Sequence, residues 1–456
     1  MNERRVPLAR QRFKPYPAYK DSAVEWLGEI PAHWEVKRLK FVAARNPAAS
    51  KVRGLAPDTE VSFVPMEAVG EYGGLDLSRT KPLADVGPGY TYFRDGDVVV
   101  AKITPCFENG KGAHATGLVN GIAFGTTELH VLRATQALDD QFLFYLTLSD
   151  AFRRLGEAEM YGAGGQKRVP ESFIENLRHP LPSISEQRGI AAFLDRETAR
   201  IDALVAKKER VIELLQEKHT ALITRTVTKG LDPNVRLRNS GVEWLGEIPA
   251  HWETKRLWHL TPSGRRIMYG IVLPGPNVDD GVPIVKGGDV SADRLRLDQL
   301  NRTTHEIEAG YVRSRLQGGD LVYAIRGSIG EVAVVPDEIE GANLTQDAAR
   351  IAYTPATWGP WLLYALKSAA IFAQLESGAL GATIRGVNIR DLKRASIPVP
   401  PRVEQEAIAM FLERKTAKID ELVAKVRDAT DRLEEFRAAL ISAAVTGKID
   451  VREKVA

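Results

Sequence analysis

Two long stretches of the chain carry apolar residues at the spacing of a helical seam. Within residues 186–228 a leucine or isoleucine recurs every seven positions, with Lys208 as an interruption, and further apolar residues follow three positions later. The segment near the C-terminus repeats this pattern. The heptad spacing predicts two helices that each present one narrow apolar stripe to a partner. The predicted seam residues are Leu194, Ile201, Leu204, Val211, Leu215, Leu222, Leu412, Ile419, Leu422, Leu433 and Leu440.

Proline and glycine mark the ends of both predicted helices. Pro182 and Pro400 close the preceding segments, and Gly230 and Gly447 follow the last turns. Each helix then has about 43 residues and a length of roughly 65 Å. Neither stripe is wide enough to form a core alone, so we expect the helices to pair as an antiparallel coiled coil. The alternative is that each helix packs on its own domain.

Short β-branched runs predict strands in the remaining parts of the chain. Glycine, aspartate and proline bound these runs, as turns require. A helix is expected after the strands, near residues 140–155 and again near residues 358–375. The predicted strands lie at residues 61–64, 98–100, 129–131, 284–285, 321–323 and 332–335.

The chain contains two copies of one plan. Residues 22–39 (SAVEWLGEIPAHWEVKRL) match residues 240–257 (SGVEWLGEIPAHWETKRL) at an offset of 218 residues. Residues 180–207 match residues 398–425 at the same offset. A period this long is not that of a solenoid. It indicates two homologous halves related by an internal pseudo-two-fold.

Between the matching ends the halves diverge, because residues 40–179 and 258–397 share few identities. Shared ends predict a common scaffold, and divergent middles predict two different recognition surfaces. The expected fold class is α+β, with each half a mixed α/β domain followed by a long helix, and the two helices forming an antiparallel coiled-coil spacer. The expected segments are a basic N-terminal arm (1–20), a first recognition domain (21–180), a central helix and linker (181–238), a second recognition domain (239–398) and a C-terminal helix (399–456).

Composition limits the chemistry that the chain can carry. Its 62 Lys and Arg nearly balance 59 Asp and Glu, so any basic surface must be local. Cys106 is the single cysteine, which excludes an internal disulfide and a cysteine-rich zinc site. The sequence has no apolar run of about 18 residues, so we expect no membrane span, and the expected compartment is the cytoplasm.

Catalytic motifs are missing from the sequence. Asn109-Gly110-Lys111 resembles the end of a P-loop, but Pro105 stands at the first glycine position. No dinucleotide fingerprint, amino-methyltransferase motif, esterase elbow or zinc-protease helix is present. His33 and His251 recur in the repeated Pro-Ala-His-Trp, which indicates a scaffold role. We therefore expect no catalytic residue, bound metal or cofactor in this chain.

The repeated motifs resemble a known family. Trp-Leu-Gly-Glu-Ile-Pro-x-His-Trp-Glu at 26–35 and 244–253 is similar to the start of each half of specificity subunits from Type I restriction-modification systems. The Glu-Gln…Phe-Leu…Ile-Asp-x-Leu-Val-x-Lys stretches and the Leu-Ile…Val-Thr endings resemble the helices of that family. Residues 101–111 resemble a motif of one class of its target-recognition domains. The resemblance covers nearly the whole chain.

This resemblance implies a division of labour. Such a subunit is non-catalytic, and each target-recognition domain reads one half of an asymmetric, bipartite site in double-stranded DNA. The helices set the unread gap and dock two modification subunits, which use S-adenosylmethionine to methylate adenine. Restriction subunits join them and cleave unmodified DNA with ATP and Mg²⁺. The divergent middles imply two different half-sites.

Candidate DNA-binding residues follow from the chemistry of readout. Arg and Lys pair with guanine, Asn and Gln pair with adenine, and Lys, Arg, Ser and Thr contact phosphate. Glycine-rich loops allow a backbone to approach the duplex closely. The candidates are Lys102, Thr104, Asn109, Lys111, Gln166, Lys167 and Arg168 in the first half, and Arg326, Ser328, Arg385 and Asn388 in the second.

Other functions stay open at this point. A self-contained nuclease or methyltransferase would need a catalytic constellation, which the sequence does not display. A coiled-coil scaffold protein without a DNA role would have no need for two divergent domains on matched frames. A specificity subunit of a related defence or modification system fits the same residues, and only the purified partners or neighbouring genes distinguish it.

Overall fold

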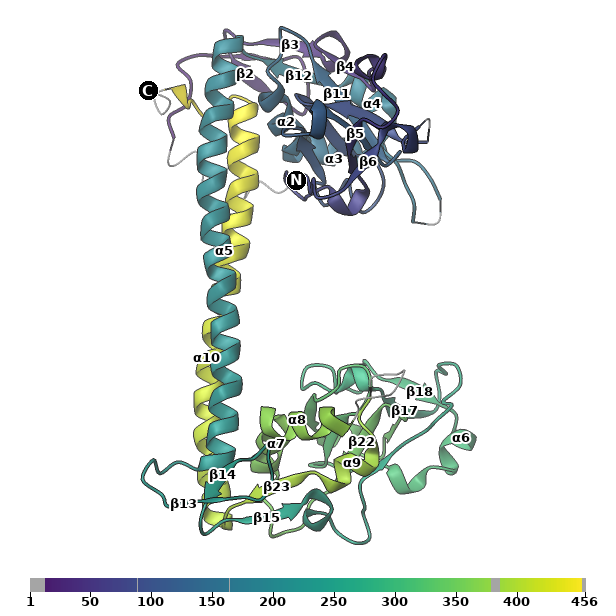
Figure 1. The fold of residues 1–456 in the computed structure, drawn as a ribbon, viewed down its shortest axis with the longest axis vertical. Coiled ribbons are helices and arrows are strands. Elements are labelled where there is room, and N and C mark those ends of the chain that lie inside the picture. The colour runs from purple at the N-terminus through teal and green to yellow at the C-terminus, as the bar shows by residue number, and fades with distance from the viewer. Residues whose placement is uncertain (1–12, 88, 164, 379–385, 453–456) are drawn as a thin grey trace. The chain divides into compact units, whose positions relative to one another are not determined.

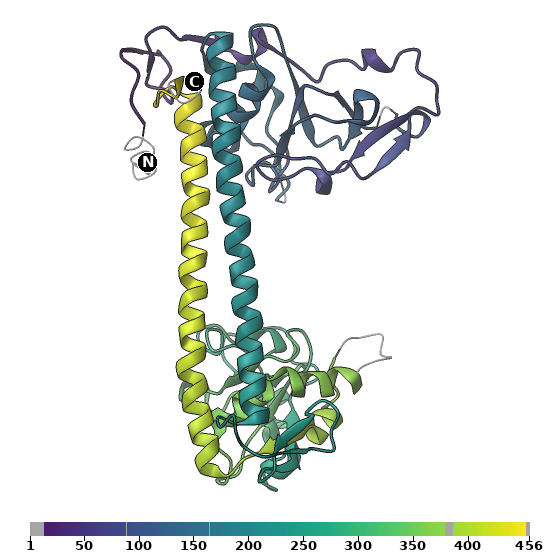
Figure 2. The ribbon, with the colours of Figure 1, turned by 60° about the vertical axis from the view of Figure 1, so that its left-hand side comes forward.

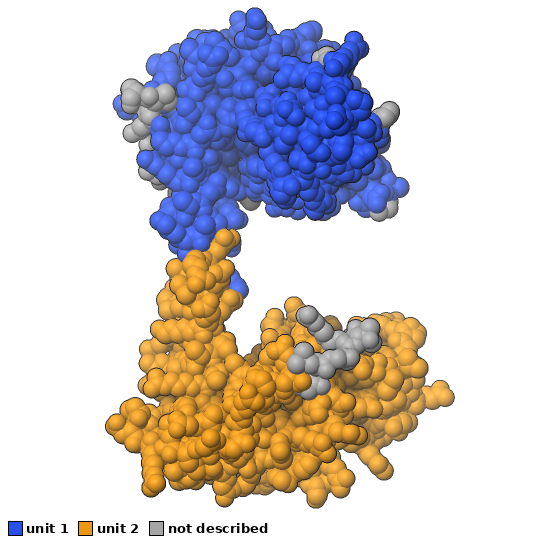
Figure 3. All heavy atoms as spheres, viewed as in Figure 1, with its two compact units in different colours: residues 1–208, 427–456 blue, residues 209–426 orange. Residues whose placement is uncertain are grey.

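The computed structural model describes residues 13–87, 89–163, 165–378 and 386–452 (Figure 1). The chain divides into two compact units (Figure 3): unit 1 comprises residues 1–208 and 427–456, and unit 2 comprises residues 209–426. The two predicted long helices are confirmed as α5 (Ile184–Lys229) and α10 (Arg402–Val445). Each of these helices contributes one part to each unit.

Unit 1 is a mixed α/β structure. Its described strands form two four-stranded sheets, in the orders β6-β5-β10-β7 and β4-β11-β8-β9, and two strand pairs, β1-β2 and β12-β3. The strands are β1 (Tyr19–Asp21), β2 (Glu29–Pro31), β3 (Glu35–Arg38), β4 (Ala43–Arg45), β5 (Glu60–Val64), β6 (Thr80–Pro82), β7 (Thr91–Arg94), β8 (Asp97–Ala101), β9 (Gly112–His114), β10 (Ile122–Gly125), β11 (Leu129–Ala134) and β12 (Arg178–Leu181). The helices are α2 (Asp140–Leu148), α3 (Asp150–Ala158) and α4 (Glu171–Asn176).

Unit 2 repeats this plan with one four-stranded sheet and one three-stranded sheet. Its described strands form the sheets β16-β22-β19-β20 and β18-β17-β21 and the pairs β13-β14 and β15-β23. The strands are β13 (Leu237–Asn239), β14 (Glu247–Pro249), β15 (Glu253–Arg256), β16 (Met268–Tyr269), β17 (Val282–Val285), β18 (Asn301–Thr303), β19 (Leu321–Ala324), β20 (Val332–Val334), β21 (Asn343–Leu344), β22 (Ala348–Ile351) and β23 (Ser396–Val399). The helices are α6 (His305–Ala309), α7 (Gly359–Lys367), α8 (Ala369–Gly378) and α9 (Ile389–Arg394).

The predicted strands are found, and each predicted short helix is two helices. A serine breaks the helix in both units. Ser149, with ψ 143°, ends α2, and its hydroxyl accepts a hydrogen bond from Phe152 N at the start of α3. Ser368 separates α7 from α8 with ψ 144°. Serine competes for backbone hydrogen bonds and favours such caps, so the continuous helices expected near 140–155 and 358–375 were wrong.

The long helices run in opposite directions within each unit (Figure 2). In unit 1 Leu194, near the start of α5, shares a core with Leu440, near the end of α10. In unit 2 Ile223, near the end of α5, shares a core with Leu412, near the start of α10. The expected antiparallel helix pairing is therefore confirmed inside each unit.

Each helix part also packs on the α/β domain of its own unit, so both predicted packing arrangements occur together. Phe193 and Leu194 of α5 lie in the same buried cluster as Phe142 and Leu146 of α2. In unit 2 Leu412 shares its cluster with Trp361 and Leu362 of α7. Each helix buries apolar area against the other helix and against the domain. This burial stabilises the packing by about 25 cal/mol for each Å² of apolar area removed from water.

Part of the predicted seam register is wrong. Leu194, Ile201, Leu412, Ile419 and Leu440 are buried, and Leu215, Leu222 and Leu433 are half-buried. Leu204, Val211 and Leu422 are 47%, 44% and 49% exposed. Their following neighbours Val205, Ile212 and Val423 are half-buried instead. The seam steps by four and then three residues from Ile201, whereas the sequence analysis took three first. Both orders give the same seven-residue period.

Candidate nucleic-acid interface

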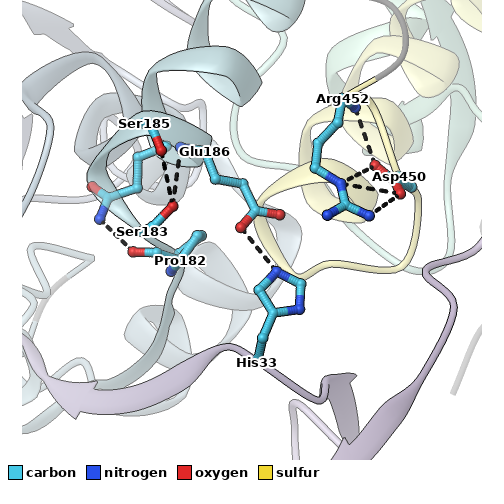
Figure 4. A network of polar contacts seen from close by, with 8 residues as sticks. His33, Pro182, Ser183, Ser185, Glu186, Asp450 and Arg452 are labelled. Atoms are coloured by element: carbon cyan, nitrogen blue, oxygen red, sulfur yellow. Dashed lines mark hydrogen bonds and ion pairs between the residues drawn. The ribbon is translucent and has the colours of Figure 1, made fainter.

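The repeated Trp motif joins each α/β domain to the long helices. In unit 1 His33 Nε2 lies 3.0 Å from Glu186 Oε2 in the first turn of α5 (Figure 4). In unit 2 His251 Nε2 lies 2.7 Å from Glu404 Oε1, and Trp252 Nε1 donates to Glu404 Oε2 at 2.9 Å. These contacts place an acidic side chain at each helix N-terminus, where the helix dipole favours it. The histidines therefore have a structural role.

The glutamine that follows each of these glutamates forms a second joint. Gln187 is buried, accepts a hydrogen bond from Asp139 N at 2.8 Å and donates to Pro182 O at 2.9 Å. Gln405 makes the same two kinds of bond, to Trp358 N at 2.7 Å and Pro400 O at 2.9 Å. Equivalent joints hold both units, so the variable loops of both units start from equivalent frames.

In unit 1 the two predicted DNA-binding segments lie against each other. Thr104 N donates to Lys167 O at 3.0 Å, and Lys167 N donates to the Thr104 hydroxyl at 3.0 Å. Val169 N donates to Lys102 O at 2.8 Å. The described residues of segment 161–168, which precedes α4, therefore form one surface with loop 102–111, between β8 and β9. The hydrogen bonds of Thr104 with Lys167 therefore hold the two segments together.

The predicted residues on this surface differ in how free they are to bind DNA. Gln166 and Lys167 are exposed and Lys102 is half-buried; none of the three side chains makes a hydrogen bond or ion pair with the described residues. Arg168 instead donates to both carboxylate oxygens of Glu128, at 2.8 Å and 3.0 Å. Its hydrogen bonds hold the pKa of Glu128 below its usual range.

The tip of loop 102–111 is fastened from two sides. Asn109 Nδ2 donates to Glu71 Oε1 at 3.2 Å, and Lys111 Nζ donates to Met66 O at 3.2 Å. From below, Arg153 Nη1 donates to Phe107 O at 2.8 Å, and its guanidinium stacks 4.9 Å from the Phe107 ring. Burial lowers the pKa of Arg153 to about 10. Sequence reasoning missed Arg153, because it stands beside the exposed Arg154 in a helix of mixed polarity and no local signal distinguishes the two.

Unit 2 builds its candidate surface in the same way. Val387 stands 218 residues after Val169, which is the repeat offset. Val387 N donates to Ile325 O at 2.8 Å, as Val169 N donates to Lys102 O in unit 1. Arg326 and Ser328 are exposed in the turn between β19 and β20, and Arg326 Nη1 lies 3.9 Å from Asp347 Oδ1. Gly327 has φ +73°, a conformation that favours glycine.

The remaining two predicted residues of unit 2 have different outcomes. Asn388 caps α9, because its side-chain oxygen accepts a hydrogen bond from Arg390 N at 2.8 Å. Arg385 lies outside the described residues, although its sequence position matches that of Lys167 at the repeat offset.

The described residues contain no cluster of three His, Cys, Asp or Glu side chains that could hold a metal ion. Over the same part of the chain, no helix is both long and apolar enough to cross a membrane. The structure thus defines a duplicated two-unit protein, in which divergent polar loops are mounted on equivalent joints to a pair of long helices.

Comparison with known proteins finds similarity to one family. Residues 273–428 match the model of the Type I restriction modification DNA specificity domain. The specificity subunit of the Type I restriction enzyme EcoAI from Escherichia coli is 40% identical over 182 residues, which are 40% of this chain and 30% of that protein. This chain therefore spans about a third of the length of the first curated relatives that it matches.

Two solved structures share the fold. The crystal structure of the HsdS subunit from Thermoanaerobacter tengcongensis has a TM-score of 0.50 at 20% identity, covering 92% of this chain and 98% of that one. A chain from work on complex assembly and conformational transition of the type I R-M system has a TM-score of 0.68 at 18% identity, covering 91% and 98%. The chain is similar to specificity subunits of Type I restriction-modification systems, and its residues 273–428 carry the match to the DNA specificity domain.

Proposed function

We propose that this chain selects the DNA sequence on which a Type I restriction-modification complex acts. Loop 102–111 with segment 161–168 in unit 1 would read one half of a bipartite site. The turn after β19 with residues 386–388 in unit 2 would read the other. The modification subunits would methylate adenine in each half.

The observation that carries this proposal is the repeated frame beneath unlike loops. The Val169–Lys102 and Val387–Ile325 hydrogen bonds, both 2.8 Å long, hold equivalent segments in the two units. On unit 1 this frame presents the side chains of Gln166 and Lys167, and on unit 2 it presents Arg326 and Ser328. Amide, cationic and hydroxyl groups are the ones that match base edges and phosphates.

The long helices would dock two modification subunits and set the unread gap between the half-sites. Exposed apolar side chains on α10 support the docking role, because Val403 is 78% exposed and Met410 is 69% exposed. S-adenosylmethionine, ATP and Mg²⁺ would then act in the modification and restriction subunits. The complex would work in the cytoplasm. The division of the chain into five segments, from the basic arm at 1–20 to the C-terminal helix at 399–456, is part of this proposal.

Methylation sequencing of DNA from cells that co-express this chain and its modification subunit tests the proposal. We expect methylated adenine in two unlike half-sites at a fixed separation. A chimera that replaces residues 40–179 with those of a relative should change one half-site and leave the other. Absence of a new motif, with the modification subunit active and bound, would contradict the proposal and favour a scaffold without a DNA role.

A further inference from the structure

Arg437 connects the helix pair to the first recognition loop of unit 1. Its guanidinium carbon lies 4.3 Å from the centre of the Tyr72 ring. Its Nη1 lies 2.5 Å from Asp202 Oδ1 on α5, and the Arg437 side chain is only 15% exposed. A guanidinium over an aromatic ring is attracted by the negative face of the ring, and the ion pair fixes its orientation. Tyr72 is therefore held by a cation that both helices position.

Tyr72 in turn holds the tip of loop 102–111. Its backbone N donates to Gly110 O at 3.2 Å. Its ring covers Gly110 so closely that a Cβ there would lie 3.4 Å from Tyr72 Cε1. The neighbouring Glu71 accepts the hydrogen bond from Asn109. Residues 71 and 72 thus contact and hold the part of the loop that carries Asn109 and Lys111.

The backbone of Tyr72 points to a use for this contact. Tyr72 has φ +60°, a left-handed conformation that is unfavourable for a bulky residue. The side chain is 44% exposed, so burial in the core does not repay that cost. The contacts with Arg437 and Gly110 are the ones that hold it. Strain kept at a partly exposed position next to a binding loop indicates a functional constraint.

The internal repeat provides a comparison for this arrangement. At the offset of 218 residues, Arg437 corresponds to His219 and Asp202 corresponds to Asp420. In unit 2 His219 Nε2 lies 3.9 Å from Asp420 Oδ1. The polar pair between the helices is therefore kept, while the long, planar guanidinium that reaches Tyr72 belongs to unit 1.

We propose that Tyr72 and Arg437 are positioning residues for base discrimination by unit 1. They hold loop 102–111 in a fixed place relative to α10, so that its polar groups meet base edges with the geometry that hydrogen bonds require. This inference rests on the proposed function. A loop released from Arg437 would still meet phosphates, whose recognition tolerates movement, but it would lose sequence preference.

The test compares Tyr72→Ala and Arg437→Lys with the wild type, each in complex with the modification subunits. Binding to the cognate site is measured against sites with one base changed in either half. We expect the penalty for a wrong base in the unit 1 half to fall from about tenfold or more to about threefold or less. The penalty in the unit 2 half should be unchanged. Tyr72→Phe keeps the ring and should behave as the wild type.

Two matched controls and a DNA-free measurement complete the design. His219→Ala, at the repeat position of Arg437, and Tyr90→Ala, another exposed tyrosine of unit 1, should leave both penalties unchanged. Hydrogen exchange at residues 109–111 should accelerate in Tyr72→Ala and Arg437→Lys without DNA. Unchanged exchange would overturn the clamp itself, and faster exchange with unchanged penalties would overturn its role in discrimination. A wild-type complex without sequence preference would instead overturn the proposed function, whatever the exchange shows.

Discussion

Gly447, at the end of α10, packs directly on Trp34 of the repeated motif: a Cβ at Gly447 would lie 2.9 Å from Trp34 Cζ3 and 2.4 Å from Pro31 Cδ. The counterpart in unit 2 is looser, because a Cβ at Gly230 would lie 3.2 Å from Trp252 Cζ2. Both glycines have positive φ, +71° and +75°. The repeated Trp motif therefore packs against the C-terminal end of one long helix in each unit.

Gly447→Ala should destabilise the protein more than Gly230→Ala. Both substitutions force alanine into the left-handed region, at a cost of about 1 kcal/mol. Gly447→Ala adds a steric clash with a proline ring and a buried tryptophan, for a total loss of roughly 2–4 kcal/mol. Urea unfolding of the two variants measures the difference. Equal losses would show that the Trp34 contact relaxes without cost.

His179 should make the protein sensitive to mild acid. It is buried in β12, and burial lowers its pKa to about 4 from 6.5. Because the folded state binds this proton more weakly than the unfolded state does, stability is lost as the pH falls from about 6.5 to about 4. The loss reaches about 3 kcal/mol at most, at about 1.4 kcal/mol for each pKa unit.

The repeat itself supplies the test of this acid sensitivity. The position of His179 is occupied in β23 by Ile397, which is fully buried. His179→Ile should therefore fold and should reduce the loss of unfolding free energy between pH 7.5 and pH 4.5. His305→Gln, at an exposed position, should leave the loss as in the wild type. An unchanged loss in His179→Ile would place the acid sensitivity elsewhere.

Lys167→Gln should weaken DNA binding in a salt-dependent way. Lys167 is exposed on the candidate surface of unit 1. If it contacts a phosphate, its removal lowers the slope of log affinity against log salt by about 1, because one fewer counterion is released. Lys207→Gln, on the exposed side of α5, is the matched control and should leave the slope unchanged. The same slope in both variants would remove Lys167 from the interface.

The corrected seam register predicts that one alanine substitution in α5 destabilises the protein strongly and that another, three residues later, hardly changes its stability. Ile201 is 6% exposed and Leu204 is 47% exposed, although they lie less than one turn apart on α5. Ile201→Ala should reduce the unfolding free energy by about 2–4 kcal/mol, since it leaves a cavity between the helices and the domain. Leu204→Ala should change it by about 0.5 kcal/mol or less. Urea unfolding of both variants decides between the two registers.

Much of the fold followed from the sequence because the signals were periodic. The 218-residue repeat implied two similar units, and the seven-residue spacing implied long paired helices. A β-branched run such as Val98–Val100 marked a buried strand. The helix breaks at Ser149 and Ser368 were missed because a mid-helix serine and a capping serine look alike in one sequence.

The candidate surface was partly accessible in the same way. Glycine-rich and polar character selected loop 102–111 and segment 161–168, and the structure brings them together through the Thr104–Lys167 bonds. Which of their side chains are already engaged was not predictable. Arg168 pairs with Glu128, 40 residues away in the sequence, and no local pattern links them.

The duplication, the helices, the strands and the resemblance to a family could all be predicted from the residues, since these features depend on local spacing and composition. The seam register at Leu204, the burial of Arg153 beneath Phe107 and the contact of Arg437 with Tyr72 became visible only in the folded chain. Each of these depends on residues far apart in the chain. Their side-chain contacts are set by packing in three dimensions, which a periodic pattern leaves open.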